Sequence, residues 1–311
     1  MHVLGIDAGG TKTVCLLADA EGRIVAEARG GGANLQASGE LEVEKVLHGV
    51  MEQAIGDREV RPDVVCLGIA GVDRPTDADA VRGIMRRLGF KSRTLIVNDA
   101  LVALVAGVGD SAGVVLVAGT GSIAYGRDGS GRAARSGGWG YLLGDEGGGF
   151  WIGRSALAAV VRQFDGRGPA TMLTDLVLTE MHLGSPTELI HAIYDKGLQR
   201  RAIAAIAAVV QRAADAGDAM ASEILTRAGA ELGAAAASVI GRLGMRGDLF
   251  RTVLAGGIFH AIPALVADVR GRLSEVAPRS ETQLLTVEPA VGAVRLALAA
   301  ASGHVNIPVY I

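Results

Sequence analysis

One short pattern occurs twice in the chain: an apolar strand runs into a glycine-rich turn and returns as a second strand. The first turn is Asp7–Thr13 and the second turn is Gly119–Ser122. Glycines let a backbone approach a phosphate closely, and free N–H groups in such a bend can form a nest for an anion. The repeat therefore predicts two related domains that face each other, each contributing one turn.

The first turn narrowly misses the P-loop signature. Gly5 and Gly10 have its spacing, but Thr11 stands before Lys12, and a strand rather than a helix is expected to follow. An ordinary hairpin without a ligand is the alternative interpretation. The acid at the end of the apolar strand, Asp7, favours a phosphate site instead, because it is placed to hold a hydrated Mg²⁺.

The second turn imitates a dinucleotide-binding loop. Gly119, Gly121 and Ala124 satisfy the spacing GxGxxG/A, but that loop should open a helix. Here the residues continue as a strand into the hairpin signal at Asp128–Gly131. Glycines and hydroxyls at the end of a strand suit phosphate oxygens better. We therefore expect the two turns to hold one triphosphate from opposite sides.

The order of the remaining elements indicates an α/β fold. Strands are expected at Val3–Ile6, Thr13–Ala18, Ile24–Ala28, Val64–Ile69 and Thr94–Val97, and helices at Glu40–Ile55, Asp77–Leu88 and Asp99–Val105. Three strands followed by alternating helices and strands predict a mixed sheet with helices on both sides.

The second half repeats this opening and then becomes mostly helical between Ser155 and Gly244. A last helix at Ala290–Ala301 is expected to pack back on the first domain. We therefore expect an N-terminal domain of residues 1–110 plus 290–311, and a C-terminal domain of residues 111–289 with a helical insertion.

The composition excludes several classes of protein. A net charge of -3 and a pI near 6.1 give no electrostatic reason to expect nucleic acid or an anionic membrane as a partner. Cys15 and Cys66 lie in apolar runs and are expected to be buried, reduced thiols, and no Cys/His cluster suggests zinc. The sequence shows neither a signal peptide nor a membrane-spanning run, so we expect a cytoplasmic protein.

Asn98-Asp99 ends the strand Thr94–Val97 and opens a helix. Open α/β sheets bind ligands at the carboxyl ends of their strands. In one interpretation Asp99 is a helix cap with no further role. In the other it is the carboxylate that accepts the proton of an attacking hydroxyl during phosphoryl transfer.

The segment Gly137–Gly149 combines glycines with Trp139, Asp145 and Glu146. A flexible linker would be rich in serine and would lack the apolar Trp-Gly-Tyr-Leu-Leu run. Carboxylates beside an aromatic ring suit sugar hydroxyls, and glycines allow close approach of the backbone. We therefore expect this segment to contact a sugar.

Together these motifs resemble a known superfamily. Asp7–Thr11, Asn98-Asp99, Gly119–Ser122 and Leu254–Gly257 are similar, in order and spacing, to the phosphate-1, catalytic, phosphate-2 and adenosine motifs of the sugar kinase/actin/chaperone ATPases. Gly137–Ile152 resembles N-acetylglucosamine kinase and its bacterial relatives, the BadF/BadG/BcrA/BcrD-type ATPase family. The resemblance implies two actin-like (ribonuclease H-like) α/β domains around a central cleft, each with a mixed five-stranded sheet flanked by helices.

Carried over onto this sequence, the resemblance implies a role for each matching residue. Asp99 is the general base for the 6-hydroxyl of the sugar, and Asp7 holds Mg²⁺ through water. The expected ATP-binding residues are Gly9, Gly10, Thr11, Lys12, Thr13, Gly119, Thr120, Gly121, Ser122, Ala214, Asp218, Gly256 and Gly257. The expected sugar-binding residues are Asn34, Gly71, Asn98, Asp99, Thr120, Gly138, Trp139 and Asp145.

The resemblance thus implies a homodimeric kinase that uses ATP and Mg²⁺ to phosphorylate an amino sugar, with N-acetylglucosamine as the first choice. Glucosamine, N-acetylmuramic acid and glucose are alternative substrates. Two other roles stay open, an ATPase activator of a radical dehydratase or reductase and a sugar sensor without catalysis. The activators share an iron–sulfur cluster through cysteines, whereas Cys15 and Cys66 lie within expected strands. A sensor has no need of a base such as Asp99.

Overall fold

The computed structural model describes residues 1–72, 74–195 and 199–310. The first part contains β1 (His2–Ala8), β2 (Lys12–Asp19), β3 (Ile24–Gly31), α1 (Leu35–Ser38), α2 (Glu40–Ile55), β4 (Val64–Ile69), α3 (Pro75–Arg87), β5 (Arg93–Asn98) and α4 (Asp99–Val108). The second part begins with β6 (Gly113–Ala118), β7 (Ser122–Arg127), β8 (Arg132–Gly137), α5 (Gly149–Phe164), α6 (Leu173–Met181), α7 (Glu188–Ile190) and a π-helical turn at His191–Asp195. It ends with α8 (Arg200–Asp215), α9 (Ala219–Arg242), β9 (Arg251–Ala255), α10 (Gly257–Ala261), α11 (Pro263–Val276), β10 (Glu281–Leu284), α12 (Ala290–Ala301) and β11 (Val309–Tyr310).

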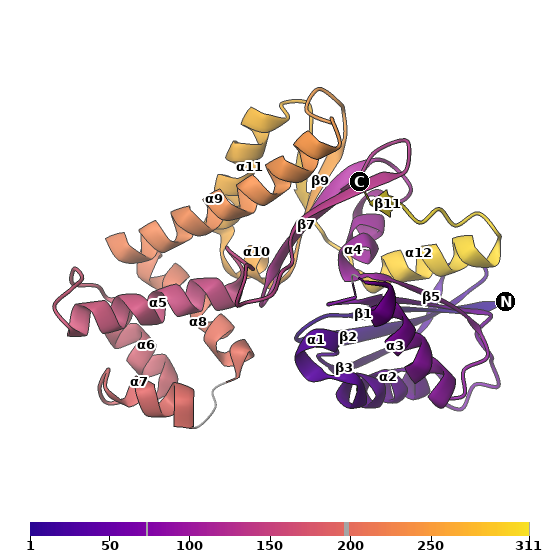
Figure 1. Ribbon diagram of the computed structural model, residues 1–311, viewed down its shortest axis with the longest axis horizontal. Helices are drawn as coiled ribbons and strands as arrows, with labels where there is room; N and C mark the ends of the chain where they lie inside the picture. Colours follow the sequence, from indigo (N-terminus) through magenta and orange to yellow (C-terminus); the bar gives the residue numbers. More distant parts are fainter. Residues whose placement is uncertain (73, 196–198, 311) are drawn as a thin grey trace.

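These elements form an α/β fold with two mixed sheets (Figure 1). The first sheet has the order β3-β2-β1-β4-β5 and the second has the order β10-β9-β6-β7-β8-β11. Five strands are present in the first sheet, as expected. The second sheet has six, because the end of the chain adds β11 beside β8. The expectation of five strands in each sheet is corrected on this point.

β1 lies at the centre of the first sheet, antiparallel to β2 and parallel to β4. The pairing of β2 with β3 completes the antiparallel meander that the sequence predicts. Every residue of β4 is buried, because α2 and α3 cover one face of the sheet while α4 and α12 cover the other (Figure 1). Strands buried on both faces read as continuous apolar runs, as Val64–Ile69 does.

α4 and α12 form a layer between the two sheets. In the second sheet, Val114 and Leu116 of β6 face the core around α9, whereas Val115 faces the core around α4. This alternation is the two-residue period of a strand covered on both faces. The core around α4 also contains Val3 and Val14 of the first sheet, so one apolar cluster touches both sheets.

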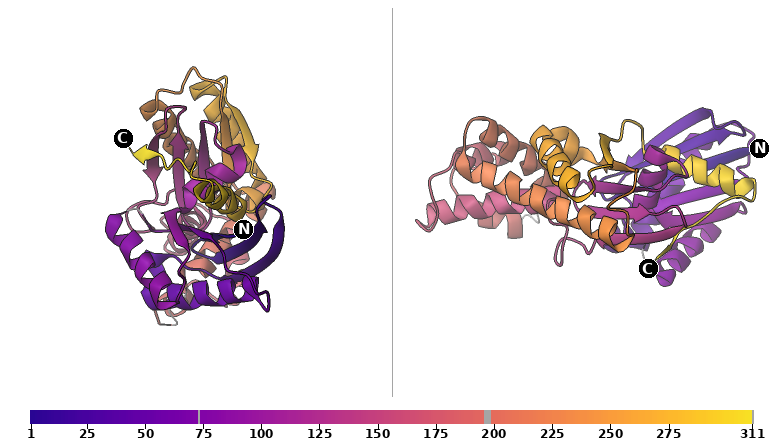
Figure 2. Two further views of the ribbon diagram at one scale, coloured as in Figure 1. Left: turned by 90° about the vertical axis from the view of Figure 1, so that its right-hand side faces the viewer. Right: turned by 90° about the horizontal axis from the view of Figure 1, so that it is seen from above.

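The molecule is elongated, with the helices α5, α6 and α7 at one end and the first sheet at the other (Figure 1 and Figure 2). α12 packs on the first sheet, as expected for Ala290–Ala301. The tail that follows does not stay with it. Val309 and Tyr310 pair with β8 of the second sheet, and the rings of Tyr310 and Tyr125 meet edge to face at 5.9 Å. Residues 290–310 are therefore shared between the two sheets, and the expected domain boundary is corrected for the described part of the tail. Among the described residues, no helix has the length and apolar character needed to span a membrane.

Gly292 allows α12 to approach α4 closely, since a Cβ at this position would lie 2.0 Å from the carbonyl oxygen of Val102 and 2.7 Å from the amide nitrogen of Ala106. Backbone atoms cannot rotate aside, so we expect Gly292→Ala to lower the free energy of unfolding by about 1–3 kcal/mol. Urea denaturation followed by circular dichroism measures the change. Gly271→Ala is the matched control, because Gly271 also lies inside a helix but faces open space. It should be neutral or stabilise by up to about 1 kcal/mol.

Candidate active site

The two glycine turns touch. The hydroxyl oxygens of Thr11 in the first turn and Thr120 in the second turn lie 2.9 Å apart in a hydrogen bond, although 109 residues separate them. Each turn joins two antiparallel strands, β1 to β2 and β6 to β7. The two turns therefore converge, and a ligand shared between them stays a prediction.

The start of α5 sets the orientation of the second turn. The amide groups of Gly149 and Phe150 donate to the carbonyl oxygens of Gly119 at 2.8 Å and of Thr120 at 2.9 Å. In a trans peptide the C=O and the following N–H point in opposite directions. The N–H groups of Thr120 and Gly121 are therefore directed away from α5, as an anion-binding turn requires.

Two carboxylates lie beside the turns. Asp7 at the end of β1 pairs with Gly68 of β4, and a Cβ on Gly68 would lie 3.4 Å from Cα of Asp99. Gly68 thus lets α4 bring Asp99 next to Asp7. Sequence reasoning missed Gly68, because a single glycine inside an apolar strand carries no recognisable motif.

The cap of α4 is Asn98, not Asp99. The side-chain oxygen of Asn98 accepts a hydrogen bond from the amide of Ala100 at 2.8 Å, and Asn98 is buried. The Asp99 carboxylate also accepts from this amide, at 3.0 Å. Since Asn98 already satisfies the cap, capping alone does not explain an acid at Asp99.

The Asp7 carboxyl lies in an environment that disfavours its charged form. Burial, reinforced by the charge of Asp99, raises its pKa to about 8, whereas the ammonium group of Lys12 acts in the opposite direction. A buried acid with a perturbed pKa beside a second acid is typical of a functional site. Its oxygen atoms are the kind of donor that Mg²⁺ prefers.

Two hydroxyls that we expected to face phosphate are used within the turns. Thr13 is fully buried, and its hydroxyl donates to the carbonyl oxygen of Gly31 at 2.8 Å. The hydroxyl of Ser122 donates to the carbonyl oxygen of Glu146 at 2.7 Å. These side chains therefore hold their turns in shape, whereas the hydroxyls of Thr11 and Thr120 lie between the turns.

Lys12 forms an ion pair that the sequence did not suggest. Its ammonium nitrogen lies 2.8 Å from one carboxylate oxygen of Glu288, and the other oxygen lies 2.9 Å from the guanidinium of Arg29. Together, Lys12 and Arg29 lower the pKa of Glu288, against the effect of its partial burial. Glu288 precedes a proline between two elements, and no motif marks it.

Two of the expected sugar residues of the first domain, Asn34 and Gly71, lie together. Gly71 has φ of +81°, and a Cβ there would lie 3.1 Å from the side-chain oxygen of Asn34. The chain before Asn34 is tied to the first turn by a hydrogen bond from the Ala33 amide to the carbonyl oxygen of Gly9. Asn34 therefore lies between the first turn and the end of β4.

Asp145 packs on the second turn. A Cβ on Gly121 would lie 2.3 Å from a carboxylate oxygen of Asp145, so only glycine leaves room for this acid. Burial raises the pKa of Asp145, while hydrogen bonds from the amides of Ser122 and Gly140 oppose the shift. Asp145 itself has φ of 60°, in the left-handed region. Its position supports the second turn directly, a contact that the sequence did not predict.

Gly138 and Trp139 follow β8 beside the same turn. The Gly138 amide donates to the carbonyl oxygen of Ser122 at 3.0 Å, and its φ is +72°. The Trp139 side chain is largely exposed, and the guanidinium carbon of Arg135 lies 4.7 Å from its ring centroid. An exposed indole held by a cation is available to a ligand.

The two glycines expected at adenosine also adjoin the second turn. Gly256 has φ of +102°, and a Cβ there would lie 2.3 Å from the carbonyl oxygen of Ala118, one residue before the turn. Gly257 then opens α10 and faces open space. The end of β9 thus places Gly256 beside the last residue of β6, directly before the second turn.

Ala214 and Asp218 each have a structural role. One carboxylate oxygen of Asp218 caps α9 by accepting from the Ala221 amide at 2.8 Å. The other accepts from the hydroxyl of Thr171 and the amide of Met172. Asp218 is buried, and Ala214 packs against the core of the helical segment, so both have a structural role in addition to the expected contact with ATP, which stays a prediction. Aspartate directly before a helix is a capping signal, and that signal could have revealed the role of Asp218.

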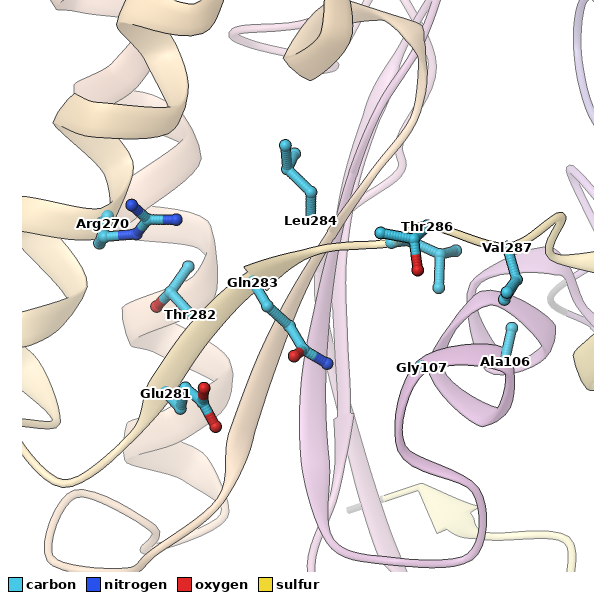
Figure 3. Close-up of a pocket in the computed structure, with 10 residues that line it drawn as sticks. Ala106, Gly107, Arg270, Glu281, Thr282, Gln283, Leu284, Thr286 and Val287 are labelled. Carbon is cyan, nitrogen blue, oxygen red and sulfur yellow. The ribbon is translucent and has the colours of Figure 1, made fainter.

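A cavity of about 500 Å³ lies away from these residues (Figure 3). It is lined by β10, by Arg270 of α11 and by Ala106 and Gly107 at the end of α4. None of the expected ATP or sugar residues lines it. The candidate site is therefore defined by the converging turns and acids, not by this cavity.

The two cysteines are buried on opposite faces of the first sheet. Cys15 belongs to the core beneath α2 and Cys66 to the core beneath α12. Burial raises the pKa of the Cys15 thiol to about 12 and raises that of Cys66 as well. Such thiols are structural rather than reactive.

The fold is shared with solved structures of sugar kinases. The chain matches a Chromobacterium violaceum protein provisionally described as an N-acetylglucosamine kinase, with a TM-score of 0.77 and 25% identity over 96% of this chain and 98% of that one. A ROK family glucokinase from Streptomyces griseus, solved with glucose and AMPPNP, has a TM-score of 0.63 at 16% identity over 96% and 98% of the two chains. The fold is therefore that of the actin-like sugar kinases.

Relatives of similar length are also known. An N-acetylmuramic acid/N-acetylglucosamine kinase of Clostridium acetobutylicum is 34% identical over 299 residues, which cover 95% of this chain and 98% of that protein. An N-acetyl-D-glucosamine kinase of Dictyostelium discoideum is 34% identical, with 95% and 97% covered. The model of the BadF/BadG/BcrA/BcrD ATPase family matches residues 4–297, and the chain belongs to this family.

The buried carboxyl of Asp7 predicts a pH dependence of stability in the presence of a metal chelator. The pKa of this carboxyl is about 8 in the folded protein, against an ordinary value of 3.8. Between about pH 4 and about pH 8 the folded state therefore keeps the proton, whereas the unfolded state releases it. The free energy of unfolding should therefore fall as the pH rises from about 4 to about 8. We expect wild type to lose up to about 1.4 kcal/mol per pH unit relative to Asp7→Asn. Urea titrations at several pH values measure this, and parallel curves for the two proteins would contradict it.

The capping role of Asp218 predicts a variant that loses stability without losing affinity for ATP. Asp218→Ala should lower the free energy of unfolding by about 1–2 kcal/mol, because it removes a cap and two further hydrogen bonds. Asp218→Asn keeps an acceptor and should cost less. Calorimetric titration with a non-hydrolysable ATP analogue should give the wild-type affinity for both variants. A clearly weaker affinity at unchanged fold would contradict a purely structural role and would support the expected contact of Asp218 with ATP.

Proposed function

We propose that this protein is an ATP-dependent kinase that phosphorylates the 6-hydroxyl of an amino sugar, with N-acetylglucosamine as the preferred substrate. The observation that carries the proposal is the contact of the two glycine turns at Thr11 and Thr120, with Asp7 and Asp99 side by side next to them. The names of two relatives support the proposal, since both proteins with 34% identity are named as kinases of N-acetylglucosamine.

In the proposed mechanism the second turn holds the transferred phosphoryl group. The N–H groups of Thr120 and Gly121, turned away from α5, are directed at its oxygen atoms. Such preorganised donors stabilise the charge of the transition state without reorganisation. The hydroxyls of Thr11 and Thr120 bridge the turns and keep the nucleotide aligned between them.

Asp99 is proposed as the general base. It begins α4 at the carboxyl end of β5, where Asn98 already serves as the cap. Its carboxylate accepts the proton of the sugar hydroxyl as the oxygen attacks the phosphorus atom, and the leaving group is ADP. The close packing of α4 on Gly68 fixes its distance from Asp7.

The residues present suit a magnesium ion. Among the described residues no group of three or more His, Cys, Asp or Glu side chains forms a protein-only metal site. Mg²⁺ is usually held by one or two carboxylates together with phosphate oxygens and water. The buried Asp7 carboxyl would be the ligand from the protein. When bound with ATP, the ion neutralises the charge that develops on the β- and γ-phosphate oxygens.

The sugar is proposed to lie among residues of both parts of the chain: Asn34, Gly71, Asn98, Gly138, Trp139 and Asp145. N-acetylmuramic acid is the second candidate substrate, because the Clostridium relative is named for both sugars. A homodimer and a cytoplasmic location belong to the proposal as well. The buried free thiols suit a reducing compartment.

The burial of Cys15 and Cys66 on opposite faces of one sheet argues against an activator that shares an iron–sulfur cluster. Such a cluster needs exposed thiolates that a second subunit can reach. A sugar sensor without catalysis would not need the paired acids Asp7 and Asp99. The kinase therefore accounts for more of the site than either rival.

The proposal predicts ADP release that depends on an amino sugar. In a coupled assay with Mg²⁺ and ATP, we expect N-acetylglucosamine to give the largest kcat/KM in a panel with glucosamine, N-acetylmuramic acid and glucose. Asp99→Ala should lower kcat by about 10²–10⁴ through loss of the base alone, while calorimetry still detects the sugar. ADP release by wild type that no sugar increases would refute the kinase, and near-normal turnover of Asp99→Ala would refute the base.

A further inference from the structure

Glu288 connects three parts of the molecule at the edge of the candidate site. It lies in the short linker between β10 of the second sheet and α12 on the first sheet. One carboxylate oxygen contacts the ammonium nitrogen of Lys12 at 2.8 Å, and the other contacts a guanidinium nitrogen of Arg29 at 2.9 Å. The linker between the sheets is thus tied to the first turn and to β3.

The register of the first sheet explains why these groups meet. Asp7 lies opposite Val14, and Val14 lies opposite Arg29, so all three occupy one face. Lys12 is two residues before Val14 and shares that face. α12 covers it, since a Cβ on Gly5, two residues before Asp7, would lie 2.4 Å from the amide nitrogen of Val294. Glu288 therefore reaches the face that carries Asp7.

Without Glu288, the ammonium group of Lys12 would have two other carboxylates within reach. Lys12 is the diagonal neighbour of Asp7 on this face, two residues along β2 from Val14, and such a pair lies within reach of a long side chain. Asp99 lies beside Asp7, because α4 packs on Gly68. A lysine on a flexible four-carbon stem turns to the nearest anion. Paired with Asp7 it would occupy the place of the magnesium ion, and paired with Asp99 it would compete with the sugar hydroxyl.

We propose that Glu288 is a positioning residue of the ATP site, which holds Lys12 where a nucleotide phosphate reaches it and keeps it away from Asp7 and Asp99. The inference rests on the proposed kinase function for the identity of the ligand. The Lys12 ammonium has three donors, and pairing with one carboxylate oxygen leaves donors for phosphate. Arg29 completes the arrangement by holding the second oxygen of Glu288.

The test is Glu288→Gln, which keeps the shape and removes the charge. We expect the KM for ATP to rise about tenfold, the scale for residues that orient a ligand-binding group, with the KM for the sugar unchanged. The dissociation constant of a non-hydrolysable ATP analogue, measured by calorimetry with Mg²⁺, should rise by the same factor. Glu288→Asp keeps the charge on a shorter stem and should restore part of the affinity.

A double-mutant cycle separates positioning from a structural role. Lys12→Met alone should raise the same dissociation constant, and adding Glu288→Gln should change it no further, because Glu288 acts through Lys12. Glu27→Gln is the matched control, since Glu27 pairs with Arg29 on the surface and does not contact Lys12. It should bind the analogue like wild type.

Three results would overturn the inference: an analogue affinity of Glu288→Gln within twofold of wild type, an affinity higher than wild type, or additive effects in the double variant. The higher affinity would mean that Glu288 competes with phosphate for Lys12. Because binding is measured without turnover, these outcomes remain readable if the sugar does not increase ADP release. In that case the kinase proposal fails by itself, and the positioning of Lys12 is judged from binding alone.

Discussion

The packing of α4 between the two sheets is the constraint on which the rest of the molecule depends. Gly68 admits α4 to the first sheet, Gly107 brings α4 against Val253 of the second, and Gly292 lets α12 reach its backbone. At each of these positions the glycine has no side chain, so the backbone or a valine side chain of the neighbouring element packs directly against it. The helix that carries Asp99 is therefore located by both sheets at once, and the distance between the two acids follows from glycines rather than from the acids themselves.

The charges around the first turn are arranged in two shells. Asp7 and Asp99 form an inner pair of acids, and burial together with the charge of Asp99 makes ionisation of Asp7 costly. Lys12, Arg29 and Glu288 form an outer group whose members satisfy one another. The buried Asp7 carboxyl therefore suits a ligand that brings its own cation. A nucleotide with a bound divalent metal has that property, whereas a free anion does not.

Much of the fold and part of the site can be predicted from the sequence. The helices Glu40–Ile55 and Ala290–Ala301 have the predicted bounds, and the two turns meet because strand ends of related topology converge. β11 could not be predicted, since two residues carry no periodicity and their pairing depends on the contact of Tyr310 with Tyr125. Glu288 and Gly68 matter through distant neighbours, which no local pattern reveals. The capping role of Asp218 could have been predicted from its place directly before a helix, whereas the resemblance implied only a contact with ATP.

The chain passes between the two sheets three times, after α4, after β10 and after α12. The apolar cluster around α4 also contains residues of both sheets, among them Val14 and Val253. Each half also has a core of its own, one beneath α2 and one around α9, but the shared cluster around α4 joins them. A chimera that replaces one half by that of a relative would therefore have to take α4, α12 and the tail from the same protein. The two halves are therefore not separable pieces, although the repeat in the sequence suggests that they are.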